Sequence, residues 1–207
     1  MNDNRIWKTS KEIIMDAYER IMKYQSGELL PARTGYPYLD KALLGGFYPQ
    51  HAIAIGARPG VGKSYLAQKI MNNVMNVNIN PQADDYVWLR CEFEMNPEDL
   101  VLRSLSKKMN KDIEDILLRK MDEEEMLEMQ KCLKQENSNR ITYIPIPTTV
   151  DELKDFLWNV YMPANKDKKI VFVSIDHTAL IQGSGDAKRN IDSLMNMCNI
   201  AKRTFPN

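Results

Sequence analysis

The sequence predicts an α/β fold, a mostly parallel sheet flanked by helices, on two observations. Short apolar stretches that suit strands alternate along the chain with stretches of helical periodicity. The stretch over 170–175 is almost wholly apolar, which is typical of a parallel strand covered by helices on both faces. We therefore expect helices and parallel strands to follow one another in βαβ order.

Strands are expected over 51–55, 86–91, 141–144 and 170–175. Helices are expected over 64–75, from Pro97 with Asn96 as the N-cap, over 111–136, after Thr149 with a capping box to Glu152, and near the C-terminus. In the charged helix over 111–136, the inner face is expected to carry Leu117, Met121, Met126, Met129 and Leu133.

Composition excludes several classes of protein. The 207 residues are 43% hydrophobic, which is enough for a packed core and excludes a disordered chain. Lys and Arg together number 28, as do Asp and Glu, so a polyanion held by bulk charge is not expected. No apolar run approaches the ~20 residues of a membrane span. The three widely spaced cysteines (Cys91, Cys132 and Cys198) indicate free thiols in a reducing cytoplasm, without metal-ligand spacing.

An amphipathic helix is predicted over 11–24, ahead of a polar linker over 25–33. Thr9 and Glu12 form a capping box at its start. Its apolar stripe consists of Ile13, Ile14, Ala17, Tyr18, Ile21 and Met22. The stripe needs a partner, and periodicity leaves open whether that is the chain's own domain or a neighbouring subunit.

The most informative segment is Gly56–Ser64, GARPGVGKS, which follows an expected strand and opens an expected helix. Its glycines allow backbone N–H groups to point inward at phosphate oxygens, next to the positive end of the helix. Lys63 can reach the outer phosphates, and the Ser64 hydroxyl can hold Mg²⁺. An ordinary glycine-rich turn would not need Lys-Ser here. The expected nucleotide-binding residues are Ala57, where the strict pattern has Gly, Arg58, Pro59, Gly60, Val61, Gly62, Lys63 and Ser64.

Carboxylates follow two of the expected strands. Asp176 ends the strand over 170–175, at the edge where ligands collect in parallel sheets, and is expected to coordinate Mg²⁺ directly or through water. The alternative for Asp176 is a simple strand-end cap. Glu92 and Glu94 follow the strand over 86–91, and either could polarise an attacking water; spacing alone does not choose between them.

From about residue 11 onward, the chain resembles the RecA-like ATPase domain of DnaB-type replicative DNA helicases of bacteria or phages. Residues 33–40, RTGYPYLD, with Gly45–Phe47, resemble the motif before the family's first core strand. Residues 55–64 resemble its Walker A motif, in which Ala at position 57 is a familiar variant. Residues 174–176 resemble the Walker B strand, although His177 stands where the family usually has Tyr.

The resemblance carries further expectations. Residues 93–95, Phe-Glu-Met, match the segment with the family's catalytic glutamate, which assigns water activation to Glu94. By the same likeness, residues 1–30 are a linker helix and linker that dock on the adjacent protomer of a homo-hexameric ring. Residues 31–207 are a RecA-like P-loop NTPase core, incomplete at its C-terminus, because the family's next strand, DNA-contacting loop and trans-acting basic residues do not follow.

A contact with single-stranded DNA is expected from a mobile loop over 182–190 that faces the pore of the ring. Lys188 and Arg189 could contact its phosphates there; the alternative is a solvated pair at the start of a helix.

The sequence thus predicts an ATP-dependent, Mg²⁺-dependent replicative DNA helicase subunit, with primase or a helicase loader as candidate partners. Lys63 and Glu94 are its expected catalytic residues. Weak or no ATPase activity is expected of this chain alone. The alternatives are a non-helicase RecA-like ATPase, of recombinase or helicase-loader type, and a nucleotide-binding module that has lost hydrolysis.

Overall fold

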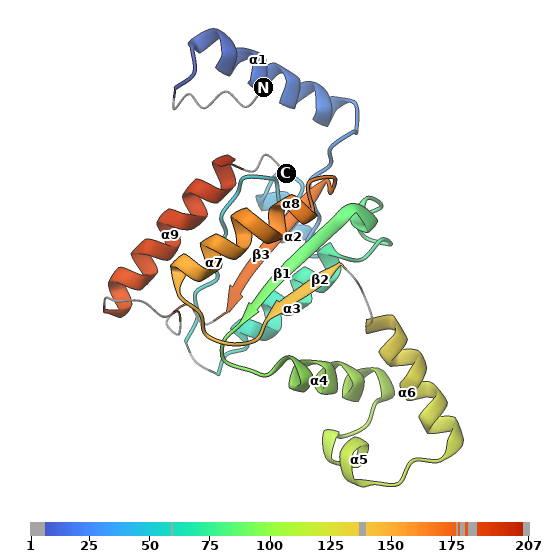
Figure 1. The fold of residues 1–207 in the computed structure, drawn as a ribbon. Coiled ribbons are helices and arrows are strands. Elements are labelled where there is room, and N and C mark those ends of the chain that lie inside the picture. Colours follow the sequence, from blue (N-terminus) through green and yellow to red (C-terminus); the bar gives the residue numbers. More distant parts are fainter. Residues whose placement is uncertain are drawn as a thin grey trace.

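A three-stranded parallel sheet forms the centre of the molecule, in the order β2-β1-β3 (Figure 1). The computed structural model describes residues 7–58, 60–136, 140–176, 178, 181 and 186–204. The strands are β1 (Tyr86–Glu92), β2 (Ile141–Ile144) and β3 (Ile170–Asp176). β1 runs parallel to both neighbours, which confirms the predicted α/β fold with a parallel sheet.

The helices follow the predicted alternation with the strands. Their bounds are α1 (Ser10–Gln25), α2 (Pro37–Ala42), α3 (Lys63–Val74), α4 (Pro97–Met109), α5 (Ile113–Leu118), α6 (Glu123–Glu136), α7 (Val150–Phe156), α8 (Met162–Ala164) and α9 (Ala187–Thr204). A 3₁₀ turn over Ala83–Asp85 precedes β1, and a π-helical turn over Leu157–Tyr161 joins α7 to α8.

Helices cover both faces of the sheet because successive residues of β1 point to opposite sides. Tyr86 and Trp88 pack against Ile70, Met71 and Val74 of α3 in one buried cluster. On the other face, buried side chains of β1 and of the helices α7 and α9 form a second cluster, which contains Val87, Leu89, Cys91, Leu153 and Leu194. Every residue of β1 is buried, as expected for a central strand.

The strand expected over 51–55 is not formed. Residues 51–58 have no regular secondary structure and are exposed, with Ile53 at 48% and Ile55 at 38% exposure. A strand requires a neighbouring strand for its backbone N–H and C=O groups. Within the described ranges, 51–55 pairs with no strand, although the outer edges of β2 and β3 carry no partner strand there. Apolar composition by itself therefore did not produce a strand.

The segments α4, α5 and α6 form a protrusion beyond the sheet (Figure 1). The helix expected over 111–136 is divided into α5 and α6. Its predicted inner face is partly wrong, because Ile116 and Cys132 are buried in the cluster. Three residues expected to face inward are exposed instead, namely Leu117 at 58%, Met126 at 41% and Leu133 at 37%. Met121 and Met129 pack against that cluster as expected. The shift follows from the break between the two helices, which resets the phase of the apolar residues.

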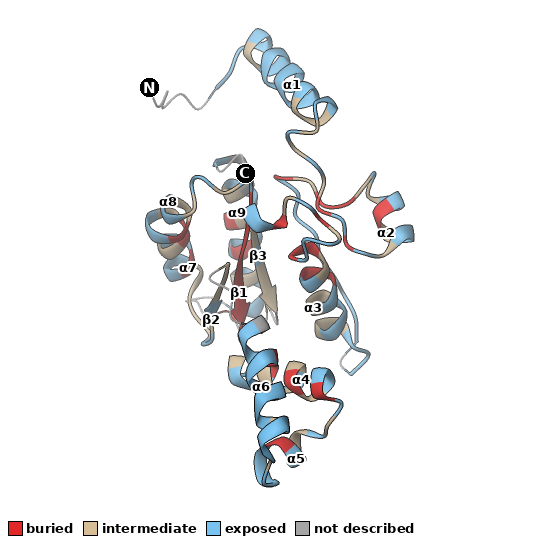
Figure 2. Cartoon of the chain, turned by 90° about the vertical axis from the view of Figure 1, so that its right-hand side faces the viewer, coloured by how far each residue is buried: buried red, intermediate tan, exposed pale blue. Residues whose placement is uncertain are grey.

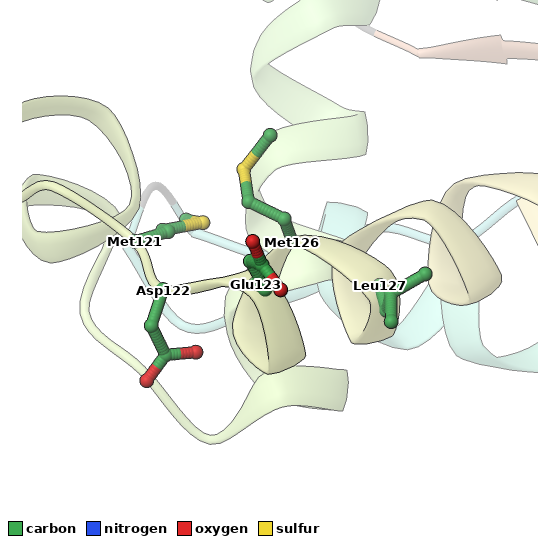
Figure 3. Close-up of a pocket in the computed structure, with 5 residues that line it drawn as sticks. All are labelled: Met121, Asp122, Glu123, Met126 and Leu127. Atoms are coloured by element: carbon green, nitrogen blue, oxygen red, sulfur yellow. The ribbon is translucent and has the colours of Figure 1, made fainter.

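An open, largely apolar hollow of about 350 Å³ lies where the protrusion turns into α6. Figure 3 shows the residues that line it, which are Met121, Asp122, Glu123, Met126 and Leu127. None of these residues belongs to the glycine-rich loop that precedes α3.

α1 stands away from the rest of the molecule (Figure 2). The predicted capping box is present: the Thr9 side chain accepts from the Glu12 N–H, and the Glu12 carboxylate accepts from the Thr9 N–H at 2.7 Å. No residue of α1, which is described in full, is buried. The predicted stripe therefore finds no partner within the chain as described. Within the described ranges, no helix combines the length and the apolar character needed to cross a membrane.

Candidate nucleotide-binding site

The loop before α3 has the backbone conformation that its glycines predict. Gly60 has φ +79° and Gly62 has φ +93°, left-handed values that L-residues rarely adopt. Ala57, Arg58 and Val61 are exposed along the same loop, while Pro59 lies outside the described residues. The two glycines let the chain curl and then enter the helix at Lys63.

The first turn of α3 presents backbone donors. Gly62 is the N-cap, and the first α-helical bond runs from the Leu66 N–H to the Gly62 carbonyl at 2.9 Å. The N–H groups of Lys63, Ser64 and Tyr65 precede that bond and have no acceptor within the helix. Together with the positive end of a 12-residue helix, these amides favour an anion at this position.

Lys63 and Asp176 meet across the gap between α3 and β3. Lys63 Nζ lies 2.7 Å from Asp176 Oδ1, and the two side chains are 31% and 20% exposed. Asp176 is the last residue of β3, at the carboxyl end of the parallel sheet. Ser64, next to Lys63, is half-buried. The fold therefore brings the glycine-rich loop and the acidic end of β3 to one place, which residue spacing could only suggest.

Glu92 and Glu94 have different surroundings. Glu92 is paired in register with Asp176, and it lies on the same face of β1 as Trp88, which packs toward α3. Glu92 is buried, and Arg90 Nε donates a hydrogen bond to its carboxylate. Burial raises the pKa of Glu92; the hydrogen bond and charge of Arg90 oppose this, and the charges of Asp176 and Glu94 add to it. Glu94, two residues on, is exposed.

Arg90 is the residue near the site that sequence reasoning missed. Its guanidinium lies 4.8 Å from the Trp88 ring and 5.7 Å from the Tyr143 ring, in addition to its ion pair with Glu92. The Trp88 indole N–H in turn donates to Ser174 Oγ at 2.7 Å. The available signal was an arginine and a glutamate two residues apart, and thus on one face, within a strand expected to be buried.

Ser64 and Asp176 fit a magnesium ion by the chemistry of their donors. Hydroxyl and carboxylate oxygens are hard ligands, and Mg²⁺ in nucleotide sites takes one or two protein carboxylates while phosphates and water complete its shell. Asp176 lies beside Lys63, the neighbour of Ser64. In the part of the chain that the structure describes, no group of three or more His, Cys, Asp or Glu residues suits a metal ion.

Lys188 and Arg189 lie in the first turn of α9, where both are exposed. The Arg189 backbone N–H donates to the Asp186 carboxylate at 2.9 Å. The loop expected over 182–190 is thus wrong for its last four residues, which are helical because Asp186 caps the helix. Residues 182–185 and His177 lie outside the described residues.

Three features define a P-loop NTPase of RecA-like fold. They are a parallel sheet with helices on both faces, a glycine-rich loop before a helix, and a lysine of that helix beside the acid that ends a strand. The chain belongs to the DnaB-like helicase C terminal domain family, whose family model matches residues 32–203.

Several known proteins are similar to this chain. It is 26% identical over 183 residues to the replicative DNA helicase DnaC of Bacillus subtilis (strain 168), a match that covers 87% of the chain and 38% of that protein. It is 25% identical over 187 residues to the replicative DNA helicase DnaB of Geobacillus stearothermophilus, covering 89% of the chain and 39% of that protein. The chain thus spans less than two fifths of the length of these curated relatives.

Two solved structures share the fold. One, described as an ATPase domain, matches with a TM-score of 0.72 at 18% identity, over 96% of this chain and 68% of that one. A DnaB-like replicative helicase, described with its interactions with primase, matches with a TM-score of 0.66 at 17% identity, over 95% of this chain and 46% of that one.

Proposed function

We propose that this chain is the ATP-binding motor core of a replicative DNA helicase subunit, which couples ATP hydrolysis to movement along single-stranded DNA and to duplex unwinding. The observation that carries the proposal is the 2.7 Å ion pair between Lys63 of the glycine-rich loop and Asp176 at the end of β3. Membership of the DnaB-like helicase C terminal domain family supplies the reaction class.

ATP binds with its phosphates against the loop and the first turn of α3. The amides of Lys63, Ser64 and Tyr65 donate to phosphate oxygens, and Lys63 exchanges its carboxylate partner for the outer phosphates. This exchange costs little free energy, because the ion pair between Lys63 and Asp176 is partly solvated. Once Lys63 has left it, the Asp176 carboxylate is available to Mg²⁺.

Ser64 and Asp176 hold Mg²⁺, which neutralises charge on the phosphates when it is bound. Glu94 orients the attacking water for in-line displacement at the γ-phosphate. Glu92 is the weaker candidate for this role, because its buried carboxylate is engaged by Arg90. Catalysis then rests on positioning and on charge stabilisation.

α1 joins subunits in a ring of six, docking its apolar stripe on the adjacent protomer. The support is its exposure: Ile14 is 63% and Tyr18 is 59% exposed, on a helix with no buried residue. A stripe of this kind is stabilised when a partner removes it from water. Lys188 and Arg189, exposed on the first turn of α9, contact phosphates of single-stranded DNA in the pore. A primase is a further candidate partner, since one of the structural matches is described with its primase interactions.

The test of the motor combines binding, turnover and strand separation. Mg²⁺-dependent ATP binding is measured by calorimetry, and unwinding is followed on a forked DNA duplex. We expect Lys63→Ala to lose ATP binding. Glu94→Gln should keep binding, while the weak turnover expected of this chain falls further, by roughly 10²–10⁴-fold. Glu98→Gln, an exposed acid on the first turn of α4, is the control and should behave as the unchanged chain. Turnover stimulated by DNA without strand separation would contradict the helicase assignment.

Ring assembly is tested separately by light scattering after size exclusion. Ile14→Asp places a charge in the exposed stripe of α1 and should reduce assembly without changing the free energy of unfolding of the monomer. Leu44→Asp, at a residue that is 83% exposed outside α1, is the matched control. Equal assembly of the two variants would contradict the docking role of α1.

A further inference from the structure

Tyr65 is an exposed aromatic residue in the first turn of α3, directly after the glycine-rich loop. It follows Ser64 directly in the first turn of α3, and its side chain is 57% exposed. Its backbone N–H is one of the three amides that precede the first helical hydrogen bond. The residue thus offers a donor to a phosphate and, one side-chain length away, an aromatic surface.

A side chain of α4 contacts this ring. α4 begins at Pro97, shortly after Glu94, and extends to Met109. From its last turns, Lys107 Nζ lies 4.0 Å from the centroid of the Tyr65 ring, a cation–π contact between α4 and α3. The ammonium occupies one face of the ring, and the large exposed fraction leaves surface for a second partner.

The covalent structure of a nucleotide determines what lies beside its phosphates. A ribose and a flat base continue from the α-phosphate, so a triphosphate held by Lys63 and Ser64 places a π-face within reach of residues that border the loop. Base–aromatic stacking contributes roughly 1–3 kcal/mol per base, and it tolerates different bases because each has a π-face. An exposed tyrosine here has the size and rigidity for that contact.

We propose that the Tyr65 ring is the platform on which the base of the bound nucleotide stacks. The proposal rests on the nucleotide site described above and deepens it. The phosphates are held by the loop and by Lys63, whereas Tyr65 provides the part of the affinity that depends on the base.

The test separates the base from the phosphates. Calorimetry in Mg²⁺ measures the affinities of ATP and of inorganic tripolyphosphate, which has no base, for the full chain. Tyr65→Ala should lower the affinity for ATP by roughly 5- to 150-fold and leave the affinity for tripolyphosphate unchanged. Tyr65→Phe keeps the ring and should retain ATP affinity. Tyr38→Ala, which removes a 92% exposed tyrosine of α2, is the matched control and should change neither affinity.

Three outcomes would overturn the proposal. An equal loss of both ligands in Tyr65→Ala would mean that the ring supports the loop and does not contact the base. Unchanged ATP affinity in that variant would mean that no contact is made. Failure of the unchanged chain to bind either ligand would overturn the nucleotide site itself, and the base platform with it.

Discussion

Replacing Arg90 by Met should strongly destabilise the fold, because it leaves a buried carboxyl group without its ion-pair partner. Arg90 and Glu92 form an ion pair within β1, with side chains 5% and 8% exposed. Arg90→Met leaves the buried Glu92 carboxyl group without its donor, and it also removes the cation over the Trp88 ring. Glu92 would then be both desolvated and unpaired. Removing one partner of a buried ion pair is strongly destabilising because it leaves the other partner buried without compensation.

The expected loss is about 3–5 kcal/mol in the free energy of unfolding. With an m-value of about 2 kcal/mol/M, the urea midpoint should fall by roughly 1.5–2.5 M. The double variant Arg90→Met with Glu92→Gln removes both charges together, and it should recover at least about 2 kcal/mol of that loss.

Urea denaturation followed by circular dichroism measures each variant at neutral pH. Lys8→Met provides the control, since Lys8 Nζ lies 2.6 Å from Asp16 Oδ2 in an ion pair whose side chains are 60% and 56% exposed. Solvent screens such a pair, so no resolvable change is expected. The reasoning is refuted if Arg90→Met unfolds at the same midpoint as the unchanged chain, or if the double variant is no more stable than Arg90→Met.

Three further predictions concern pH, backbone strain and thiol reactivity. The pKa of Glu92 is raised in the folded state, so between the ordinary and the raised pKa the folded state binds more protons than the unfolded state, and the free energy of unfolding falls as pH rises. Glu92→Gln should remove this fall from a series of urea denaturations at different pH, and an unchanged pH slope would contradict the prediction. At Gly46 (φ +140°), an added Cβ would lie 2.4 Å from the Ala32 carbonyl oxygen. Gly46→Ala should therefore lower the free energy of unfolding, measured by thermal unfolding, by roughly 1–3 kcal/mol. The loss should exceed that of Gly27→Ala, where an added Cβ would meet no such neighbour within 4 Å. Burial raises the pKa of Cys91 to about 12, so a thiol reagent should modify Cys91 only on unfolding. Rapid modification of Cys91 itself in the native chain, located by peptide mass mapping because Cys198 is only partly buried, would count against this.

Local patterns predicted much of the fold. The expected strands over 86–91, 141–144 and 170–175 match β1, β2 and β3 to within one residue. The capping boxes at Thr9 and Thr149 are both formed, because each depends on side chains three residues apart. The left-handed backbone conformation of Gly60 and Gly62 was also predictable, because the φ angle that a residue can adopt depends on its own side chain.

Local patterns failed where a segment depends on distant neighbours. Residues 51–55 have the composition of a strand, but in the described structure their backbone pairs with no strand of the sheet. The inner face of the helices after α4 changed because a break between α5 and α6 altered which residues point inward. The apolar stripe of α1 was predicted correctly as a pattern, but its exposure was not determined by that pattern.

The sequence by itself determined the class of this protein, because the phosphate-binding loop and the apolar β3 segment are each encoded in consecutive residues. Only the tertiary structure decided that Lys63 reaches Asp176, that Arg90 engages Glu92 while Glu94 stays exposed, and that Lys107 lies over Tyr65. Two of these pairings join residues from different elements, and the third depends on the burial of β1. Their distances and charges follow from the packing of the sheet and helices, which the order of residues along the chain does not specify.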